Sequence, residues 1–381
     1  MQPPIRETWS RAALAFRGYN TANLGRTKEL LACPAYADTL RKRLAEASSV
    51  CSEVLGRKVD LQTRVCEGRE ATLDEYAEAV ALVFAVERAQ LDLVRDVHGV
   101  DPHSAELVFG YSLGELVAMA VADILVDEEA LRVPLAMATD CAKLASGVTM
   151  GVLFSRALPI DERLIVQLCD EITQEGGGVI GISAILSPNT LLVLGQNATI
   201  DRLGKCVSEM FSKRVHLRLN DSQWPPLHTP IVWQQNIADR ASVMIQGMKI
   251  ANTLGRPPVV SLVTGKPAGC GAEARQLLRK WVDHPQRLWD AVRAVLHSPA
   301  QTVVHVGPAP NVIPATFHRL SENIRQLRAK NNLSGLSARA LGPIADRPWL
   351  ASRLPTTAAL LRAPQLRHVI LEDWLVENAP S

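Results

Sequence analysis

The stretch "ELVFGYSLGELVAMAVADIL" (residues 106–125) decides how the rest of the chain is interpreted. Its first five residues form an apolar, strand-like run, and from Leu113 onward the apolar residues have helical spacing. Ser112 lies between two glycines at the junction. A strand–GxSxG–helix turn presents the serine hydroxyl at the carboxyl edge of a sheet. The stretch therefore predicts that Ser112 is a nucleophile, and the alternative is a serine in a tight turn.

The composition is that of an ordinary globular protein. The chain has 381 residues, 47% hydrophobic and 21% charged, which suits one large or two modest domains. Its formal net charge is only +2, aromatic residues make up 4%, and no basic run is interleaved with them. These features argue against a nucleic-acid partner. Because no run of 18 apolar residues occurs, we also expect no membrane span.

The seven cysteines are scattered, and no pair has CxxC spacing. This pattern predicts neither a zinc site nor a dithiol redox motif, so we expect no bound metal. The chain begins "MQPPIRETW", without an apolar signal segment. We therefore expect a cytoplasmic protein with free thiols.

Strand and helix signals alternate along the first part of the chain. Residues 13–25 begin as a buried strand and continue into a Gly/Asn-rich turn, and residues 72–99 have helical periodicity. The same pattern returns with strand-like runs at 258–265 and 302–310. This alternation favours an α/β architecture with a largely parallel sheet.

The pattern changes between residues 148 and 214, where the predicted order is β-α-β-β-α. That order suits an inserted ferredoxin-like subdomain. We therefore expect an α/β core at 1–147 and 215–330, the insertion at 148–214, and a C-terminal helical extension at 331–381. Nine Lys/Arg residues lie between Ala315 and His368 against two acids. This basic stretch is either a solvated surface or a landing patch for an acidic partner.

A nucleophilic serine needs a base, and nine histidines are available. His228 lies in the Pro-rich segment "WPPLHTPIV", a loop between predicted elements, where catalytic side chains are often held. The other histidines considered occur in strand-like runs or turn-like segments, namely His98, His103, His216 and His305. Spacing alone does not single out His228 among them.

The chain resembles the malonyl-CoA:acyl-carrier-protein transacylase family, which includes the acyltransferase domains of polyketide synthases. Seven segments over roughly residues 13–320 carry the resemblance in the family's order. "LAFRGYNTANLG" is similar to "FPGQGSQxxGMG", "GYSLGEL" to "GHSxGE", and "SAILSPNTLLVLGQ" to "AxxNSPxQxVxSG". "PPLHTPIV" is similar to "FHSPLM", "PVVSLVTGKP" to "PxxSNVTGxP", "HPQRLW" to "PVRW", and "VHVGPAPNVI" to "xEVGPGxVL".

The resemblance implies an α/β-hydrolase-like core with the ferredoxin-like insertion. It makes Ser112 the acylated nucleophile and His228 its general base, oriented by a backbone carbonyl around Gln286 or Arg287. The oxyanion hole would be the backbone N–H groups of Leu113 and Tyr19. Acyl-CoA would be the donor, the phosphopantetheine thiol of an acyl carrier protein the acceptor, and no cofactor would be bound.

Departures from the family motifs bear on the substrate. Tyr111 replaces the histidine before the nucleophile, Leu186 replaces the asparagine of "NSP", and Tyr19 replaces the glutamine of "PGQG". Malonyl-specific members have an arginine 25 residues after the serine, which pairs with the substrate carboxylate. That position is Met137 here, which offers a carboxylate no donor.

We therefore expect an uncharged acyl group, with Met137, Tyr111 and Arg287 contacting the substrate. Ordinary core packing is the alternative for Met137. Pro134 within the same predicted helix can shift the register, and Arg132 is the nearest arginine to replace the missing one.

Two other functions remain open at this stage. A proofreading acyl-thioester hydrolase would use the same serine and histidine and admit water. A non-catalytic scaffold would dock carrier proteins, which the substitutions at Tyr19, Leu186 and Met137 permit. Retention of both Ser112 and His228 favours the transferase over the scaffold.

Overall fold

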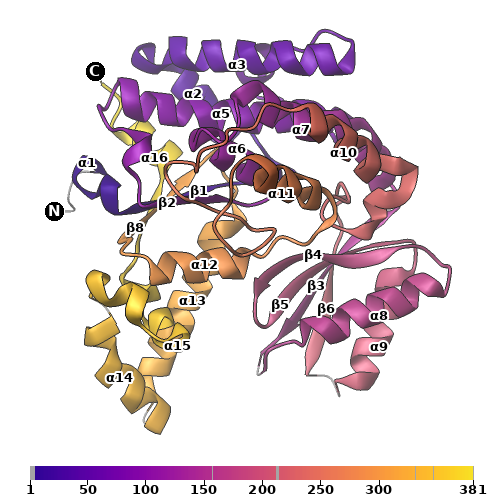
Figure 1. Cartoon of the computed structure of the whole chain (residues 1–381), viewed down its shortest axis with the longest axis vertical. Coiled ribbons are helices and arrows are strands. Elements are labelled where there is room, and N and C mark those ends of the chain that lie inside the picture. The colour runs from indigo at the N-terminus through magenta and orange to yellow at the C-terminus, as the bar shows by residue number, and fades with distance from the viewer. Residues whose placement is uncertain (1–4, 157, 212–213, 331, 346, 381) are drawn as a thin grey trace.

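In the computed structural model, which describes residues 5–156, 158–211, 214–330, 332–345 and 347–380, a five-stranded parallel sheet forms the centre of the larger part (Figure 1). The strands lie in the order β7-β2-β1-β8-β9, and all pairs are parallel. This agrees with the α/β architecture predicted from the alternating sequence pattern. The strands are β1 (Ala12–Phe16), β2 (Leu107–Gly110), β7 (Val259–Val260), β8 (Thr302–Val306) and β9 (Arg367–Ile370).

Strand β1 is buried on both faces because helices cover both sides of the sheet. Leu14 and Phe16 pack into one apolar cluster, whereas Ala13 and Ala15 pack into another on the opposite face. The helices of the first cluster are α1 (Ile5–Thr8), α2 (Thr27–Ala32), α3 (Pro34–Leu55), α4 (Leu61–Glu67), α5 (Tyr76–Asp96), α6 (Leu113–Val121), α7 (Asp127–Ala145), α10 (Ile237–Gly247), α11 (Gly271–Asp283) and α16 (Leu371–Glu377). The helices on the opposite face are α12 (Leu288–His297), α13 (Val312–Ala329), α14 (Leu333–Ala345) and α15 (Thr356–Ala359).

The C-terminal segment differs from the expected helical extension. It returns to the core, where β9 adds a fifth strand beside β8 and pairs with it from Thr302 to His305. Helix α16 then packs against α2, α5 and β8. Strand β9 is only four residues long, "RHVI", and runs directly into α16, so the sequence pattern suggested one continuous helix.

A four-stranded antiparallel sheet forms the second part, at the lower right of Figure 1. Its order is β4-β5-β3-β6, and helices α8 (Glu162–Gln174) and α9 (Thr199–Met210) pack against it. The sheet extends to Asn220, six residues beyond the expected boundary at 214, because β6 pairs with β3. The strands are β3 (Val148–Ser155), β4 (Ile180–Ser187), β5 (Thr190–Gln196) and β6 (Val215–Asn220).

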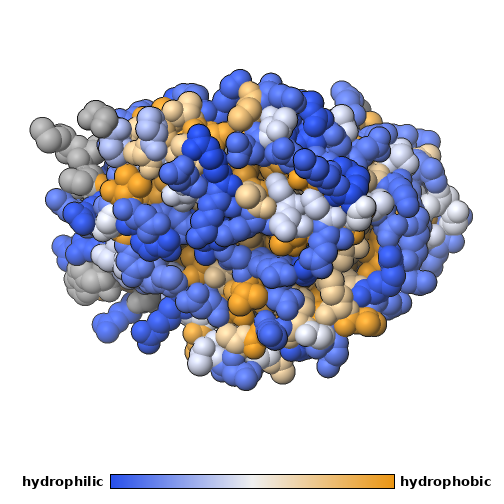
Figure 2. Space-filling view, turned by 90° about the horizontal axis from the view of Figure 1, so that it is seen from above, coloured by the Kyte–Doolittle hydropathy of each residue, from blue (hydrophilic) through white to orange (hydrophobic). Residues whose placement is uncertain are grey.

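Seen from the side of α3, the surface is mostly hydrophilic, with hydrophobic side chains in scattered patches (Figure 2). Among the described residues, the helices are all too short or too polar to cross a bilayer.

Candidate active site

Ser112 occupies the sharp turn between β2 and α6. Its backbone has φ 55° and ψ −116°, a region that non-glycine residues rarely adopt. The flanking glycines make the turn possible. A Cβ at Gly110 would lie 2.0 Å from the backbone carbonyl carbon of Gly114, and one at Gly114 would lie 2.4 Å from the carbonyl oxygen of Phe16. The GxSxG pattern therefore reflects steric need, and Ser112 lies in the sharp strand–turn–helix geometry that the motif predicts.

His228 faces this serine from the Pro-rich loop. Its Nε2 lies 2.7 Å from Ser112 Oγ, and its side chain is buried. Its Nδ1 lies 2.6 Å from the carbonyl oxygen of Trp281, which requires a proton on Nδ1 and leaves a lone pair on Nε2. The expectation that Gln286 or Arg287 supplies this carbonyl is wrong. Their carbonyls accept from the N–H groups of Ile185 and Asp290, because the chain turns between Trp281 and Gln286.

The surroundings keep the His228 ring neutral. Burial lowers the pKa of His228 to about 4, and the Trp281 carbonyl and the Asp283 carboxylate offset only part of this effect. A neutral imidazole with its lone pair directed at a serine hydroxyl is able to accept the hydroxyl proton.

Trp281, at the end of α11, holds both members of the pair, and the sequence analysis did not identify it. Its indole N–H donates to the carbonyl oxygen of Ser112 (3.0 Å), and its ring meets the His228 ring edge to face at 5.0 Å. The neighbouring carbonyl of Val282 accepts from the backbone N–H of His228 (2.8 Å). A lone tryptophan in an amphipathic helix carries no signal of such a role.

Gln286 contributes a side chain rather than the expected carbonyl. It is fully buried, and its Oε1 accepts from the backbone N–H of Ser112 at 3.0 Å. Its Nε2 lies 3.3 Å from His228 Nδ1. The acceptor side of the amide must face Ser112, because an N–H donor there would meet another donor. Gln286 is therefore a contact residue of both Ser112 and His228.

The two expected oxyanion donors lie at the serine. Leu113 N–H is at the N-terminus of α6, and a Cβ at Gly18 would lie 3.2 Å from Ser112 Cβ, which places the Gly18–Tyr19 peptide beside the nucleophile. Within the described ranges, neither N–H takes part in a hydrogen bond of the folded chain. The Tyr19 ring contacts the rings of Tyr76 (4.7 Å) and Trp224 (6.1 Å) edge to face.

Met137 lies on the buried face of α7, which continues as one helix through Pro134. Helix α7 packs against α5, and Tyr76 at the start of α5 contacts the Tyr19 ring (4.7 Å), so α7 lies one helix away from the Gly18–Tyr19 segment. Arg132 instead forms ion pairs with Glu53 (2.6 Å) and Glu128 (2.8 Å) at the surface.

The other two expected substrate contacts, Tyr111 and Arg287, lie in different surroundings. Tyr111 is packed against the second core cluster together with Leu186, and burial raises the pKa of Tyr111. The Arg287 side chain pairs with Glu162 (2.9 Å) and Asp290 (2.7 Å), so it joins α8 to α12.

The other candidate histidines have different partners. His98 contacts Tyr36, His103 pairs with Asp101 and Asp123, and His305 stacks on His368. His216 lies on β6, where its ring packs near Phe154. The structure therefore selects His228 by geometry, which spacing alone did not allow.

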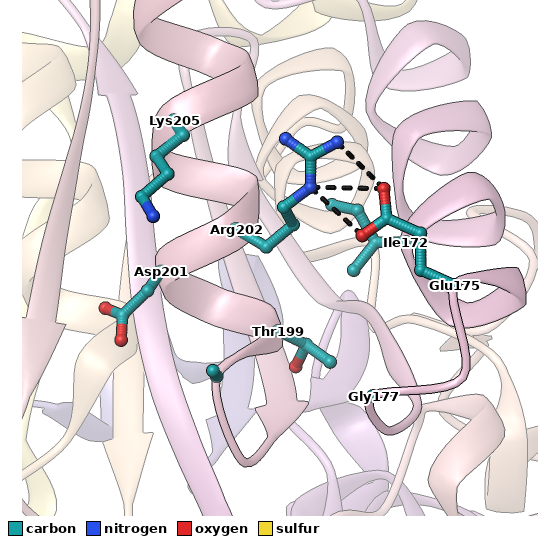
Figure 3. Close-up of a pocket in the computed structure, with 8 residues that line it drawn as sticks. Ile172, Glu175, Gly177, Thr199, Asp201, Arg202 and Lys205 are labelled. Atoms are coloured by element: carbon teal, nitrogen blue, oxygen red, sulfur yellow. Dashed lines mark hydrogen bonds and ion pairs between the residues drawn. The ribbon is translucent and has the colours of Figure 1, made fainter.

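Two other features lie outside this site. Figure 3 shows a crevice between α8 and α9, which the Arg202–Glu175 ion pair (2.8 Å) crosses. All of its lining residues belong to the antiparallel part of the molecule, so it is separate from the Ser112–His228 pair. Across the described part of the chain, no cluster of three or more His, Cys, Asp or Glu side chains is arranged to hold a metal ion.

Solved structures share this fold. The malonyl-CoA:acyl carrier protein transacylase (FabD) from Xanthomonas oryzae pv. oryzae is 21% identical, with a TM-score of 0.62 over 81% of this chain and 91% of that one. A malonyl-transacylase solved with its type II polyketide synthase acyl-carrier protein is 23% identical, with a TM-score of 0.62 over 80% and 92%. The chain therefore has the mixed α/β fold of these transacylases.

Sequence relatives point to the same class of protein, although no family model matches the chain. Polyketide synthase GfsA from Streptomyces halstedii is 25% identical over 304 residues, which is 78% of this chain but 4% of that protein. Phenolphthiocerol synthesis polyketide synthase type I Pks15/1 from Mycobacterium marinum is 28% identical over 310 residues, 78% of this chain and 13% of that protein. The chain thus spans a small fraction of these curated relatives. The resemblance to the malonyl-CoA:acyl-carrier-protein transacylase family, inferred from the motifs, is confirmed.

Proposed function

We propose that the chain is an acyltransferase that moves an acyl group from coenzyme A to an acyl carrier protein through an acyl-serine. The observation that carries the proposal is the 2.7 Å contact between Ser112 Oγ and His228 Nε2, with Nδ1 directed at the Trp281 carbonyl. This is a nucleophile–base pair with a backbone carbonyl as the orienting group. The names of the structural neighbours, which are malonyl transacylases, support the same class of reaction.

The reaction has two halves. His228 Nε2 takes the Ser112 proton as Oγ attacks the thioester carbonyl carbon, and the N–H groups of Leu113 and Tyr19 stabilise the oxyanion. The C–S bond then breaks, and the CoA sulfur leaves with the proton from His228. In the second half, His228 takes the proton of the carrier thiol, whose sulfur attacks the acyl-serine. The C–O bond breaks, and Ser112 recovers its proton.

The proposed acyl group is uncharged. Met137 occupies the buried face of α7, which lies one helix away from the Gly18–Tyr19 segment, and the Arg132 guanidinium is already paired at the surface. The Met137 thioether offers a carboxylate no donor, and burial of an unpaired anion is costly. We expect Met137→Arg to raise malonyl loading relative to acetyl loading, and Met137→Leu, the matched control, to leave the ratio unchanged. Competition between the two donors, read by intact-protein mass, measures this ratio.

The fold details of the proposal follow the same family. The antiparallel part has the order β-α-β-β-α-β with sheet order β4-β5-β3-β6, which supports a ferredoxin-like subdomain inserted in an α/β-hydrolase-like core.

The carrier protein is the proposed partner, and the basic stretch from Arg319 to Arg367 is its proposed landing surface. Arg319, Arg325, Arg339 and Arg353 are exposed there. Arg362 is excluded from this role, because it is buried and donates to the carbonyls of Leu296, Ser298 and Ala300.

The test is the intact mass of the protein after brief incubation with acetyl-, malonyl- and medium-chain acyl-CoA, with Ser112→Ala beside wild type. We expect a stable adduct from an uncharged donor that the variant lacks and that a carrier thiol discharges. A preferred malonyl adduct would contradict the acyl assignment. Release of free CoA by wild type without an adduct would replace the transferase with a thioester hydrolase. If folded protein gives neither an adduct nor free CoA, the alternative that remains is a non-catalytic scaffold that docks carrier proteins.

A further inference from the structure

Arg17 is a buried cation directly before the proposed oxyanion peptide. Its side chain is 1% exposed, and its Nε donates to the carbonyl oxygen of Gly18 at 2.8 Å. That carbonyl belongs to the peptide whose N–H is Tyr19 N–H. Because an added Cβ on Gly18 would lie 3.2 Å from Ser112 Cβ, the guanidinium binds the carbonyl of a peptide that lies beside Ser112.

The other donors of Arg17 also go to neutral oxygens. The guanidinium donates to the carbonyls of Pro308 and Ala22 (3.2 Å) and to Asn23 Oδ1 (2.9 Å). No carboxylate of the described residues forms a contact ion pair with Arg17, although Glu87, Glu372 and Glu70 act on it from a greater distance. Burial lowers the pKa of Arg17 to about 10, so the group remains protonated at neutral pH.

The surroundings fix Arg17 in place. Its backbone N–H donates to Glu87 Oε1 (2.7 Å) on α5, and a Cβ at Gly307 would lie 2.8 Å from Arg17 Cγ. The loop after β1 and the loop after β8 are tied together once more by Glu372, whose carboxylate accepts from the N–H groups of Arg26 (2.9 Å) and Ala309 (2.7 Å). The guanidinium therefore has one position relative to Gly18.

We propose that Arg17 positions and polarises the Gly18–Tyr19 peptide, so that Tyr19 N–H is aimed at the oxyanion and donates more strongly to it. A cation bound to a peptide carbonyl increases the partial positive charge on the N–H of the same peptide, since linked hydrogen bonds strengthen one another. The cation also stabilises negative charge that develops nearby in a water-poor site. Arg17 is thus a positioning residue for the reaction, and this inference rests on the proposed function.

The first test compares Arg17→Met and Arg17→Lys with wild type by the rate of Ser112 acylation. We expect Arg17→Met to lower the acylation rate constant by about 10²–10³-fold, the loss typical of one oxyanion donor, with little change in the apparent KM for the acyl donor. Arg17→Lys retains the charge and should recover much of the rate. A Met variant that acylates within threefold of wild type would overturn the inference.

Arg362→Met is the matched control, because Arg362 is also buried and also donates to backbone carbonyls, but lies away from the Ser112 loops. We expect it to lower the melting temperature to a similar extent as Arg17→Met while its acylation rate stays within threefold of wild type. Equal losses of rate in the two variants would show that a general loss of stability, and not the oxyanion peptide, explains the Arg17 effect.

The second test probes the proposed oxyanion hole with an alkyl trifluoromethyl ketone, which adds to a nucleophilic serine and forms an ionisable hemiketal. In ¹⁹F NMR titrations, Arg17→Met should raise the pKa of the hemiketal, whereas a purely structural role would leave that pKa unchanged and contradict the inference. The ketone also separates the two proposals. If the ketone adds to Ser112 but no acyl-CoA acylates it, the transferase proposal fails, and the hemiketal pKa still tests the role of Arg17. If nothing adds to Ser112, both fail.

Discussion

The two sheets contribute to the site in different ways. The parallel sheet carries the proposed reacting groups at its strand ends, because Ser112 follows β2 and the Gly18–Tyr19 peptide follows β1. The antiparallel sheet supplies backbone contacts. Ser183 and Ile185 on β4 form backbone hydrogen bonds with Gln286 at 2.9 and 2.8 Å. The parallel sheet thus carries the proposed reacting groups, and the antiparallel sheet fixes Gln286, which contacts them. Substitutions in the two sheets should therefore differ in their effects on acylation and on stability.

Among substitutions at the proposed reacting groups, removal of the general base His228 should lower the acylation rate the most. We expect His228→Ala to lower acylation by about 10²–10⁴-fold, the contribution typical of general base catalysis. Because burial lowers the pKa of His228 to about 4, wild-type acylation should stay flat from about pH 8 to pH 5 and fall only as pH drops through that pKa. Single-turnover CoA release across this range measures both. An acid limb centred near 6.5 would contradict a desolvated histidine.

The local geometry around Ser112 could be predicted from the sequence, whereas the contacts of Trp281 and Gln286 could not. Ser112, its glycines and the strand–turn–helix around it form one local pattern, so their arrangement follows from a few neighbouring residues. Trp281 and Gln286 act through contacts with partners 53 to 174 residues away, and neither residue type signals such a role. The carbonyl that accepts from His228 Nδ1 was predicted at the wrong residue for the same reason. Every residue has a backbone carbonyl, and only the fold places that of Trp281 beside His228.

Gln286 is where the two contributions meet, and we expect an intermediate effect there. Gln286→Leu leaves the Ser112 N–H without its acceptor, a loss of about 1–3 kcal/mol, which corresponds to roughly 5- to 150-fold in acylation. Gln286→Glu retains the acceptor and places a negative charge next to His228 Nδ1. It should raise the pKa of His228, so that the acid limb moves to higher pH. If the acid limb of the pH–rate profile is not shifted in Gln286→Glu, the side chain at position 286 does not influence the pKa of His228.

Damage confined to the antiparallel sheet should cost stability more than chemistry. A Cβ at Gly181 on β4 would lie 2.6 Å from Cδ of Pro230, two residues after His228. Gly181→Ala should therefore destabilise the fold by about 1–3 kcal/mol and slow acylation a fewfold as the His228 loop shifts. Gly177→Ala, where an added Cβ meets nothing within 4 Å, is the control and should be neutral. Chemical denaturation separates the two variants, and equal stabilities would show that β4 does not support the loop closely.

The smallest effect on acylation should come from Glu115 on α6, which is fully buried and whose two carboxylate oxygens have no hydrogen-bond partner among the described residues. Burial raises the pKa of Glu115 to about 8, above the ordinary value of 4.5, so the folded state holds a proton that the unfolded state releases. Stability due to this group is therefore full below about pH 4.5 and is lost as pH rises toward 8, with a slope approaching 1.4 kcal/mol per pH unit. Glu115→Gln mimics the protonated carboxyl, so it should leave acylation near the wild-type rate and remove this slope from the stability profile. A profile that Glu115→Gln does not change would show that the carboxyl is ionised in the folded state.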